Sequence, residues 1–556
     1  MKPPLSSLKV LRTLTRPGII NFSFSFSSTL TRRFSTGFPV TTTSSSSFRK
    51  TTSSSWLFLP RTFATYSSTM SINTTVGKEN IPPSTTTTTT TTRENEVGGK
   101  PLINLLRGWP NPSLLPVNQL KKVANKVLTE RNIWRDGLEY GPDPGYEPLR
   151  RRVAEWTGRY YGMSVGREEI CITGGASQNL ACLLSSFSDA GYTRRVWMAA
   201  PCYFLACPIF EDAGLKMRAV KEDEEGMDTG ELRRLLEEFE KNDMGEHKAI
   251  KSPGPHRKHY RHLIYLVPTC SNPSGKTMSL KRRKELVLVA REFNALVICD
   301  DVYDFLQWPV SSTDSSELPP LLPRLSDIDA SLGPSRHDPP GKFFGHAVSN
   351  GSFSKLAGPG TRTGWTHATA DFVLGLSQTG ATRSGGAASQ LVATMLSEML
   401  ENGELDRWLT DVVRPGLKKR HGIITRAIKE ELMEFGCEIV VDIEVFGGYF
   451  CWVKLPEGKK AKEVADMAKI KENLIVAEGP LFEVAGDEDS ARFGGNLRLC
   501  FSWEEEGRIV EGVKRLARVL KGMERERRTE IVGLEEDGGM DKVKRGRGIC
   551  YGQEFY

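Results

Sequence analysis

The chain has 556 residues and a mass of 61.9 kDa, and its 38% hydrophobic and 26% charged residues exclude a mostly disordered protein. The formal net charge is +7, but the first 78 residues hold ten Lys or Arg and no acid, so the remaining 65 bases and 68 acids carry −3. Because the basic excess lies in this leader, charge does not indicate a nucleic-acid partner, and the lack of a run of about 18 apolar residues excludes a transmembrane helix.

The leader, residues 1–78, has the composition of a mitochondrial transit peptide, rich in Ser, Thr, Phe and Arg and without acids. A disordered low-complexity tail is the alternative. Translation from Met70 would give a shorter, cytosolic product. Residues 79–99 contain two adjacent prolines and eight consecutive threonines, a composition that cannot bury a core and predicts a disordered linker.

From Pro101 onward, short apolar runs alternate with helical patterns. This alternation is typical of βα units around a mostly parallel sheet. Between Leu286 and Phe293 the apolar residues recur at helical spacing, and the following run, 295–299, predicts a buried strand. We therefore expect a helix that leads directly into a core strand.

Two stretches interrupt this alternation, residues 241–262 and residues 311–342. Both are polar and rich in proline, so they read as surface insertions, with gating of a site as the alternative. Near the end, Ser502 and Glu505 predict a capping box for a helix whose apolar residues share one face as far as Leu520. We expect residues 523–556, which are charged and rich in glycine, to form a mobile tail.

The ten cysteines are scattered between Cys171 and Cys550 and form no CxxC pair. This spacing indicates neither a zinc site nor a disulfide framework, so we expect no metal and a reducing compartment.

Six short motifs follow one another along the chain. They are YGPDPGYEPLR from Tyr140, TGGASQ from Thr173, NPSG from Asn272, CDDVY from Cys299, SFSKLAGPGTR from Ser352 and NLRLCFS from Asn496. Each is common by itself, but the six in this order resemble the class I/II aminotransferases, pyridoxal-phosphate (PLP) enzymes of fold type I. The resemblance covers roughly residues 100–522. It implies an α/β fold with a mostly parallel sheet in a large domain, 150–405, and a smaller α/β domain built from 100–149 and 406–522.

Lys355 is the candidate catalytic residue. Amine chemistry on a carbonyl cofactor needs a neutral lysine, which a solvent-poor site beside cations supplies by lowering its pKa. A surface lysine is the alternative, but the serines and glycines around Lys355 predict a tight turn. By resemblance, Lys355 forms the internal Schiff base with PLP and then moves the proton between the substrate Cα and C4′ of the cofactor.

The phosphate of PLP needs backbone N–H donors and a fixed cation. The segment Ala176, Ser177 and Gln178 lies between an apolar strand and an apolar helix, so it can present a helix N-terminus to an anion, although a plain strand-to-helix turn fits the local pattern equally. By resemblance, Arg362 adds a bidentate contact to the phosphate. Ser352 and Ser354 are expected to donate hydroxyl groups there.

The resemblance also assigns the residues around the cofactor ring. Asp300 would keep the pyridine nitrogen protonated, with the neighbouring Asp301 as the competing carboxylate. Tyr303 and Asn272 would bind the 3′ oxygen, and Tyr203 would stack on the ring. The alternatives are an ordinary Asn-Pro turn for Asn272 and a core tyrosine for Tyr203.

Substrate binding is expected at Arg498, which interrupts an apolar strand and by resemblance binds the α-carboxylate. A solvent-facing strand arginine is the alternative. Asn272 and Gly108 are expected to contact substrate as well. Arg383 is a candidate for reading an acidic side chain, but a surface ion pair is the favoured alternative. Trp109 departs from the small residue, His or Tyr that is commoner at its position in the family.

The resemblance implies a PLP-dependent aminotransferase that moves an amino group between an L-amino acid, such as 2-aminoadipate or an aromatic amino acid, and a 2-oxo acid such as 2-oxoglutarate. The alternatives are a PLP-dependent lyase or decarboxylase, which would share the cofactor ligands, and a regulator built on the same fold. By resemblance, Tyr140 crosses to the cofactor phosphate of a second subunit, which predicts a homodimer. We expect neither a nucleic-acid nor a membrane partner, and a location in the mitochondrial matrix.

Overall fold

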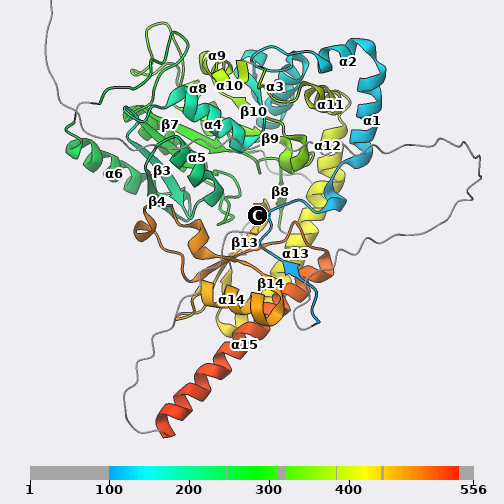
Figure 1. The fold of residues 1–556 in the computed structure, drawn as a ribbon, viewed down its shortest axis with the longest axis vertical. Coiled ribbons are helices and arrows are strands. Elements are labelled where there is room, and N and C mark those ends of the chain that lie inside the picture. Colours follow the sequence, from blue (N-terminus) through cyan, green and yellow to red (C-terminus); the bar gives the residue numbers. More distant parts are fainter. Residues whose placement is uncertain (1–98, 246, 311–320, 384, 440–443, 537–556) are drawn as a thin grey trace, which may run out of the picture. The chain divides into compact units, whose positions relative to one another are not determined.

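The computed structural model describes residues 99–536 except 246, 311–320, 384 and 440–443 (Figure 1). The expected transit leader and nearly all of the expected linker lie outside the described residues, as do part of the second insertion and residues 537–556. Among the helices of the described part, none is long and apolar enough to cross a bilayer.

An eight-stranded sheet forms the centre of the large layer, and five neighbouring strands in it run parallel. In spatial order the strands are β2 (Ile170–Thr173), β10 (Gly364–His367), β9 (Ala347–Ser352), β7 (Ala295–Asp300), β6 (His262–Leu266), β3 (Arg195–Ala200), β4 (Met217–Asp223) and β5 (Gly226–Met227). β10 is antiparallel to both of its neighbours, so β2 runs in the same direction as β9. This mostly parallel α/β sheet confirms the predicted fold class.

Helices cover both faces of this sheet, and the alternation of side chains along β7 explains why. Leu296 and Ile298 belong to one apolar cluster together with residues of α4 (Ala176–Phe187), α5 (Cys207–Asp212) and α9 (Ala370–Ser377). Val297 and Cys299 belong to another with residues of α6 (Thr229–Asn242), α7 (Leu280–Glu292) and α8 (Leu325–Ser331). A strand buried on both faces reads as a continuous apolar run, as expected for 295–299. α7 leads directly into β7, as its periodicity predicts.

The smaller layer is an antiparallel sheet of four short strands, β11 (Glu438–Ile439), β13 (Phe450–Lys454), β16 (Asn496–Cys500) and β15 (Ala477–Glu478). Its helices are α13 (Arg414–Glu431), α14 (Ala461–Glu472) and α15 (Glu506–Glu536). Two further strand pairs join distant segments: β1 (Ile103–Asn104) pairs with β14 (Leu474–Ile475), and β8 (Gln307–Pro309) pairs with β12 (Val445–Gly447).

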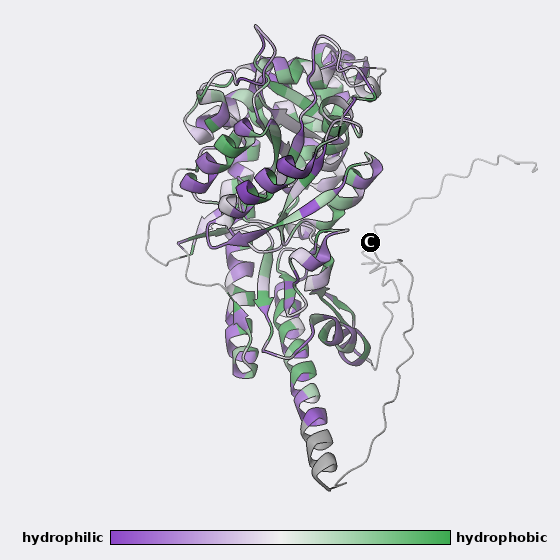
Figure 2. Ribbon diagram, turned by 90° about the vertical axis from the view of Figure 1, so that its left-hand side faces the viewer, coloured by the Kyte–Doolittle hydropathy of each residue, from purple (hydrophilic) through white to green (hydrophobic). Residues whose placement is uncertain are grey.

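The long helix α15 buries Ile509, Val513, Leu516 and Leu520, which lie on the face that the sequence predicts. Hydrophobic and hydrophilic residues alternate along its ribbon in Figure 2, as in a helix with one buried side. Two details differ from expectation. The helix continues past Met523 to Glu536, and the Ser502 hydroxyl donates to the carbonyl of Trp109 at 2.7 Å instead of capping the helix.

The stretch 100–149 is divided differently from the expected small domain. Of its elements, β1 joins the smaller layer, whereas α1 (Val117–Thr129) and α2 (Arg131–Leu138) pack against α11 (Gln390–Glu401). The next helix, α3 (Glu147–Tyr161), contacts α11 too. An ion pair of 2.5 Å between Lys126 and Glu398 joins α1 to α11. The remaining short helices of this region are α10 (Gly380–Arg383) and α12 (Glu404–Trp408).

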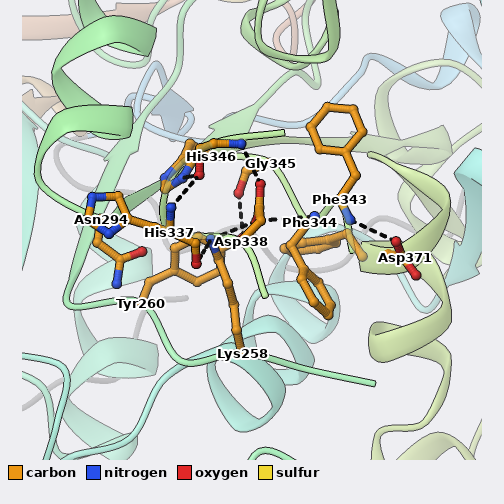
Figure 3. A network of polar contacts seen from close by, with 12 residues as sticks. Lys258, Tyr260, Asn294, His337, Asp338, Phe343, Phe344, Gly345, His346 and Asp371 are labelled. Carbon is orange, nitrogen blue, oxygen red and sulfur yellow. Dashed lines mark hydrogen bonds and ion pairs between the residues drawn. The ribbon is translucent and has the colours of Figure 1, made fainter. Parts of the chain in front are cut away.

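Most of the described residues of the two expected insertions are exposed or half-buried, but a few buried residues anchor these segments to the large layer. Lys258 Nζ pairs with the Asp338 carboxylate at 3.0 Å, and both side chains are buried (Figure 3). The hydroxyl of the buried Tyr260 donates to the carbonyl of Gly345 at 2.6 Å. Lys258 and Asp338 read as solvent-exposed in the sequence because each finds its partner in the other segment, whereas Tyr260 bonds to Gly345, just beyond the second segment.

Candidate functional site

The candidate site lies at the carboxyl edge of the parallel strands, where open α/β sheets bind ligands. β7 ends at Asp300, and β9 ends at Ser352, directly before the 3₁₀ turn Phe353–Lys355. β2 ends at Thr173, before the glycine turn that starts α4. Since these strands run in one direction, their ends bring Asp300, Lys355 and the start of α4 to the same edge.

Lys355 lies where the two layers meet, and this region is called the cleft below. Its Nζ donates to the carbonyl of Gly108 at 2.8 Å and lies 5.0 Å from the ring centroid of Tyr449. Burial, helped by the Arg498 cation, lowers the pKa of Lys355 to about 8, while Cys500 and the charge of Asp300 act in the opposite direction. A substantial fraction of Lys355 is therefore neutral near pH 8, as a nucleophilic amine requires. The contacts and burial of Lys355 exclude the alternative of a surface lysine.

Asp300 is buried and only half satisfied. One carboxylate oxygen accepts a hydrogen bond from the Tyr265 hydroxyl at 2.8 Å, while Oδ1 has no hydrogen-bond partner among the described residues. Burial raises the pKa of Asp300 to about 6, and the Tyr265 hydrogen bond and the charge of Lys355 act in the opposite direction. A buried, unpaired carboxylate oxygen is costly unless a ligand supplies a donor.

The neighbouring Asp301 is buried too and also has unpaired carboxylate oxygens, so it is the charges around the two residues that differ. The charge of Asp301 interacts with Asp304, Arg283 and Arg324, whereas Asp300 interacts with Tyr265 and Lys355. The two carboxylates therefore face different surroundings, and Asp300 is the one that shares the cleft with Lys355.

The start of α4 and Arg362 form the anion end of the site. Gly175 has a φ of +98°, and a Cβ there would lie 2.9 Å from an Arg362 guanidinium nitrogen. Arg362 donates to the carbonyl of Gly174 at 3.0 Å and to the Ser354 hydroxyl at 3.4 Å. The first backbone N–H groups of α4, from Ala176 to Gln178, have no partners within the helix and lie beside this cation.

Serine and glutamine side chains accept hydrogen bonds from the backbone of the two turns at this end of the site. The Ser352 hydroxyl accepts from the backbone N–H of Ser354 at 3.1 Å, which caps the turn before Lys355. Gln178 accepts from the backbone N–H of Gly174 at 3.0 Å. Ser177 is exposed on the first turn of α4. Gln178 therefore contributes its side chain to the loop itself.

Arg498 comes from β16 of the smaller layer and joins the two layers. Its guanidinium donates to the Asn272 side-chain oxygen at 2.8 Å and to the carbonyl of Leu106 at 2.6 Å. The guanidinium carbon lies 4.0 Å from the ring centroid of Phe450 and 4.8 Å from that of Phe482. This buried position removes the alternative of a solvent-facing arginine.

Three tyrosines complete the comparison with the sequence. Burial raises the pKa of Tyr203 to about 12, with the Asp300 charge acting in the same direction and the Arg498 cation against it. Tyr303 is buried, with its ring 5.5 Å from that of Tyr449. Tyr140 is 92% exposed and is not brought into the site of its own chain.

Sequence reasoning missed Tyr265, Tyr449, Phe450 and Phe482, which line the cleft beside Asp300, Lys355 and Arg498. Tyr265 could have been noticed because its hydroxyl needs a partner inside the buried strand HLIYL. The other three stand in ordinary apolar runs and carry no signal of their own.

These residues fit PLP. The unpaired oxygen of Asp300 suits a protonated pyridine nitrogen, the start of α4 with Arg362 suits a phosphate, and the amine of Lys355 suits an aldehyde carbon. A ring in the cleft would have aromatic neighbours in Tyr203 and Tyr303.

Comparison with known proteins agrees with a site for PLP. The family described as aminotransferase class I and II matches residues 108–516. The chain is 33% identical to an uncharacterized protein of Saccharomyces cerevisiae over 75% of this chain and 97% of that protein. It is 28% identical to the 2-aminoadipate transaminase of Thermus thermophilus over 76% of this chain and 91% of that enzyme. The solved kynurenine aminotransferase of Pyrococcus horikoshii, in complex with PMP, aligns with a TM-score of 0.61 and 26% identity over 76% and 91% of the two chains.

The lowered pKa of Lys355 predicts how the apoenzyme takes up PLP. Only the neutral amine attacks the aldehyde, so the rate of the absorbance change on mixing with PLP should rise with pH and level off above about 8. Stopped-flow absorbance between pH 6.5 and 10 on the wild type measures it, and Lys355→Ala, which should show no such change, is the control. A midpoint near the ordinary lysine value of 10.5 would contradict the assignment.

Proposed function

The chain belongs to the class I and II aminotransferases, and from this premise we propose that it moves an amino group from 2-aminoadipate or an aromatic L-amino acid to a 2-oxo acid such as 2-oxoglutarate. It is a PLP-dependent transaminase. The substrate proposal draws on the names of the Thermus and Pyrococcus relatives. The observation that supports the chemistry best is the amine of Lys355, held with Asp300 and Arg498 in one cleft.

We assign the roles of the chain's own residues as follows. When bound, PLP supplies the electron sink that allows the Cα proton of an amino acid to be removed. Lys355, displaced by the incoming amino group, would accept the proton from Cα of the substrate and donate it to C4′ of the cofactor. Arg498 binds the α-carboxylate, with Asn272 holding its guanidinium in place. Asp300 keeps the pyridine nitrogen protonated.

The remaining contacts position the cofactor. In this proposal Tyr203 stacks on the ring, and Tyr303 with Asn272 binds its 3′ oxygen. The phosphate is bound by the start of α4, by serine hydroxyls and by the Arg362 cation; the residues are Ala176, Ser177, Gln178, Ser352, Ser354 and Arg362. The carbonyl of Gly108 accepts from Lys355 in the free enzyme and lies where substrate would enter.

A panel of amino donors with 2-oxoglutarate tests the function. We expect glutamate to form with 2-aminoadipate or aromatic donors, and Lys355→Ala to lower the rate by at least about 10²–10⁴-fold because it removes the proton-transferring group. Without an acceptor, the holoenzyme should release one equivalent of oxo acid per site and stop. Repeated turnover without an acceptor would show a lyase or decarboxylase instead, and no transfer from any donor would reject the proposal.

We also propose a homodimer with composite sites. Tyr140 is 92% exposed, and Val117, Leu128 and Leu138 on the nearby α1 and α2 are each more than half exposed. Exposed large apolar side chains on these two neighbouring helices support an interface there. In the proposed dimer, Tyr140 of one subunit reaches the cofactor phosphate of the other.

Co-expression of Tyr140→Ala and Lys355→Ala subunits tests the composite site. A mixed dimer places both changes in one site and leaves the other intact, so random mixing should restore about a quarter of wild-type activity. Each variant alone, purified and checked for folding, is the control. A fully active monomer in light scattering, or no recovery in isolated mixed dimers, would contradict the proposal.

We propose that residues 1–78 direct the enzyme to the mitochondrial matrix and that a product starting at Met70 stays in the cytosol. The support is the acid-free, arginine-containing composition of the leader. A fluorescent protein fused after residue 78 should enter mitochondria, and one fused to residues 70–98 should not. A fusion of residues 1–78 that stays in the cytosol would contradict the targeting role.

A further inference from the structure

Arg107 stands between two residues that contact the cations of the site. The carbonyl of Leu106 accepts from Arg498 at 2.6 Å, and the carbonyl of Gly108 accepts from Lys355 at 2.8 Å. Consecutive Cα atoms are about 3.8 Å apart, so the backbone of Arg107 lies within a few ångströms of both contacts, between the proposed α-carboxylate site and the reacting amine.

Aromatic rings hold the Arg107 side chain. Its guanidinium carbon lies 4.6 Å from the ring centroid of Trp109 and 5.3 Å from that of Trp503, and the two indoles meet edge to face at 5.4 Å. An arginine stacked in this way is attracted to the ring faces while the N–H donors at its edge stay available.

No protein acceptor uses those donors. Within the part of the chain that the structure describes, the Arg107 guanidinium has neither a hydrogen bond nor an ion pair. The acids that follow Trp503 are already engaged: Glu504 accepts from the backbone N–H of Asn104 and from Arg508, and Glu505 accepts from Asn111. The cation is therefore available to an anionic ligand.

The backbone around Arg107 is held in place. The Asn104 side chain accepts from the backbone N–H groups of Leu106 and Arg107, both at 3.0 Å. The Ser502 hydroxyl holds the carbonyl of Trp109 at 2.7 Å. A fixed backbone and stacked rings reduce the entropy that the arginine would lose when it binds a ligand.

We propose that Arg107 binds the distal carboxylate of a dicarboxylic substrate, the 2-oxo acid acceptor above all, and so determines the preference for dicarboxylic over monocarboxylic substrates. The inference rests on the proposed function. Arg498 binds the α-carboxylate, the reacting carbon faces Lys355, and the second carboxylate meets the free donors of Arg107 in a bidentate pair. Arg383, the other arginine considered for this role, is exposed and lies 3.5 Å from the carboxylate of Asp143, so it already has a partner.

Kinetics of the holoenzyme with two acceptors test the proposal. 2-Oxoglutarate and 2-oxopentanoate differ only in the distal carboxylate, and the ratio of their kcat/KM values measures its contribution. Arg107→Met should lower this ratio at least tenfold, because a lost charged hydrogen bond costs that much discrimination. Arg107→Lys should retain part of it, and Arg383→Met is the matched control that should leave the ratio unchanged.

Calorimetry gives a readout that does not depend on turnover. Holoenzyme should bind glutarate more tightly than pentanoate, and Arg107→Met should abolish this preference while its visible PLP absorbance stays that of the wild type. An unchanged kcat/KM ratio or unchanged glutarate preference in Arg107→Met would overturn the proposal, as would a shift of either in Arg383→Met. A wild-type enzyme that transfers nitrogen to no 2-oxo acid would instead reject the proposed function, while the calorimetric comparison would still decide the role of Arg107.

Discussion

The unpaired carboxylate oxygen of Asp300 is the constraint on which the site depends. A carboxylate buried at the end of β7 costs free energy unless a donor reaches it, and the Tyr265 hydroxyl satisfies only one of its oxygens. The strand order of the sheet brings the turn with Lys355 to the same edge, so an amine and a carboxylate share a cleft. A ligand that donates a hydrogen bond to Asp300 would remove this cost, and in the proposed function the protonated pyridine nitrogen of PLP is that donor.

The site also depends on contact between the two layers, because each layer contributes residues to it. Arg498 belongs to the antiparallel sheet, and its guanidinium bonds to Asn272 of the large layer and to the backbone at Leu106. The segment from Asn104 to Trp109 thus contacts the cations of both layers. Substitutions in this short segment can alter substrate selection without changing the cofactor ligands. In our proposal, Arg107 is the residue of this segment that selects dicarboxylic substrates.

Much of the fold and of the site was predictable because the signals are local. The helix and strand around Phe293 follow from apolar periodicity, and the candidate site residues stand in motifs at strand ends, which a parallel sheet brings to one edge. What sequence reasoning could not supply depends on distant partners. Lys258 and Asp338 read as solvated residues until they are seen paired with each other, and α1 and α2 give no sign that α11 is their neighbour. Tyr449 stands in an apolar run, and its position beside Lys355 comes from the pairing of β13 with β16.

The central claim is that Lys355 is the residue that holds PLP, and chemical trapping tests it most directly. Sodium borohydride reduces the covalent link between a lysine and PLP to a stable secondary amine, which mass spectrometry locates after digestion. The account predicts one modified lysine per chain, at Lys355, and its loss from holoenzyme treated first with an amino acid that releases the lysine. A modification at another lysine, or none in an enzyme that contains stoichiometric PLP, would contradict it.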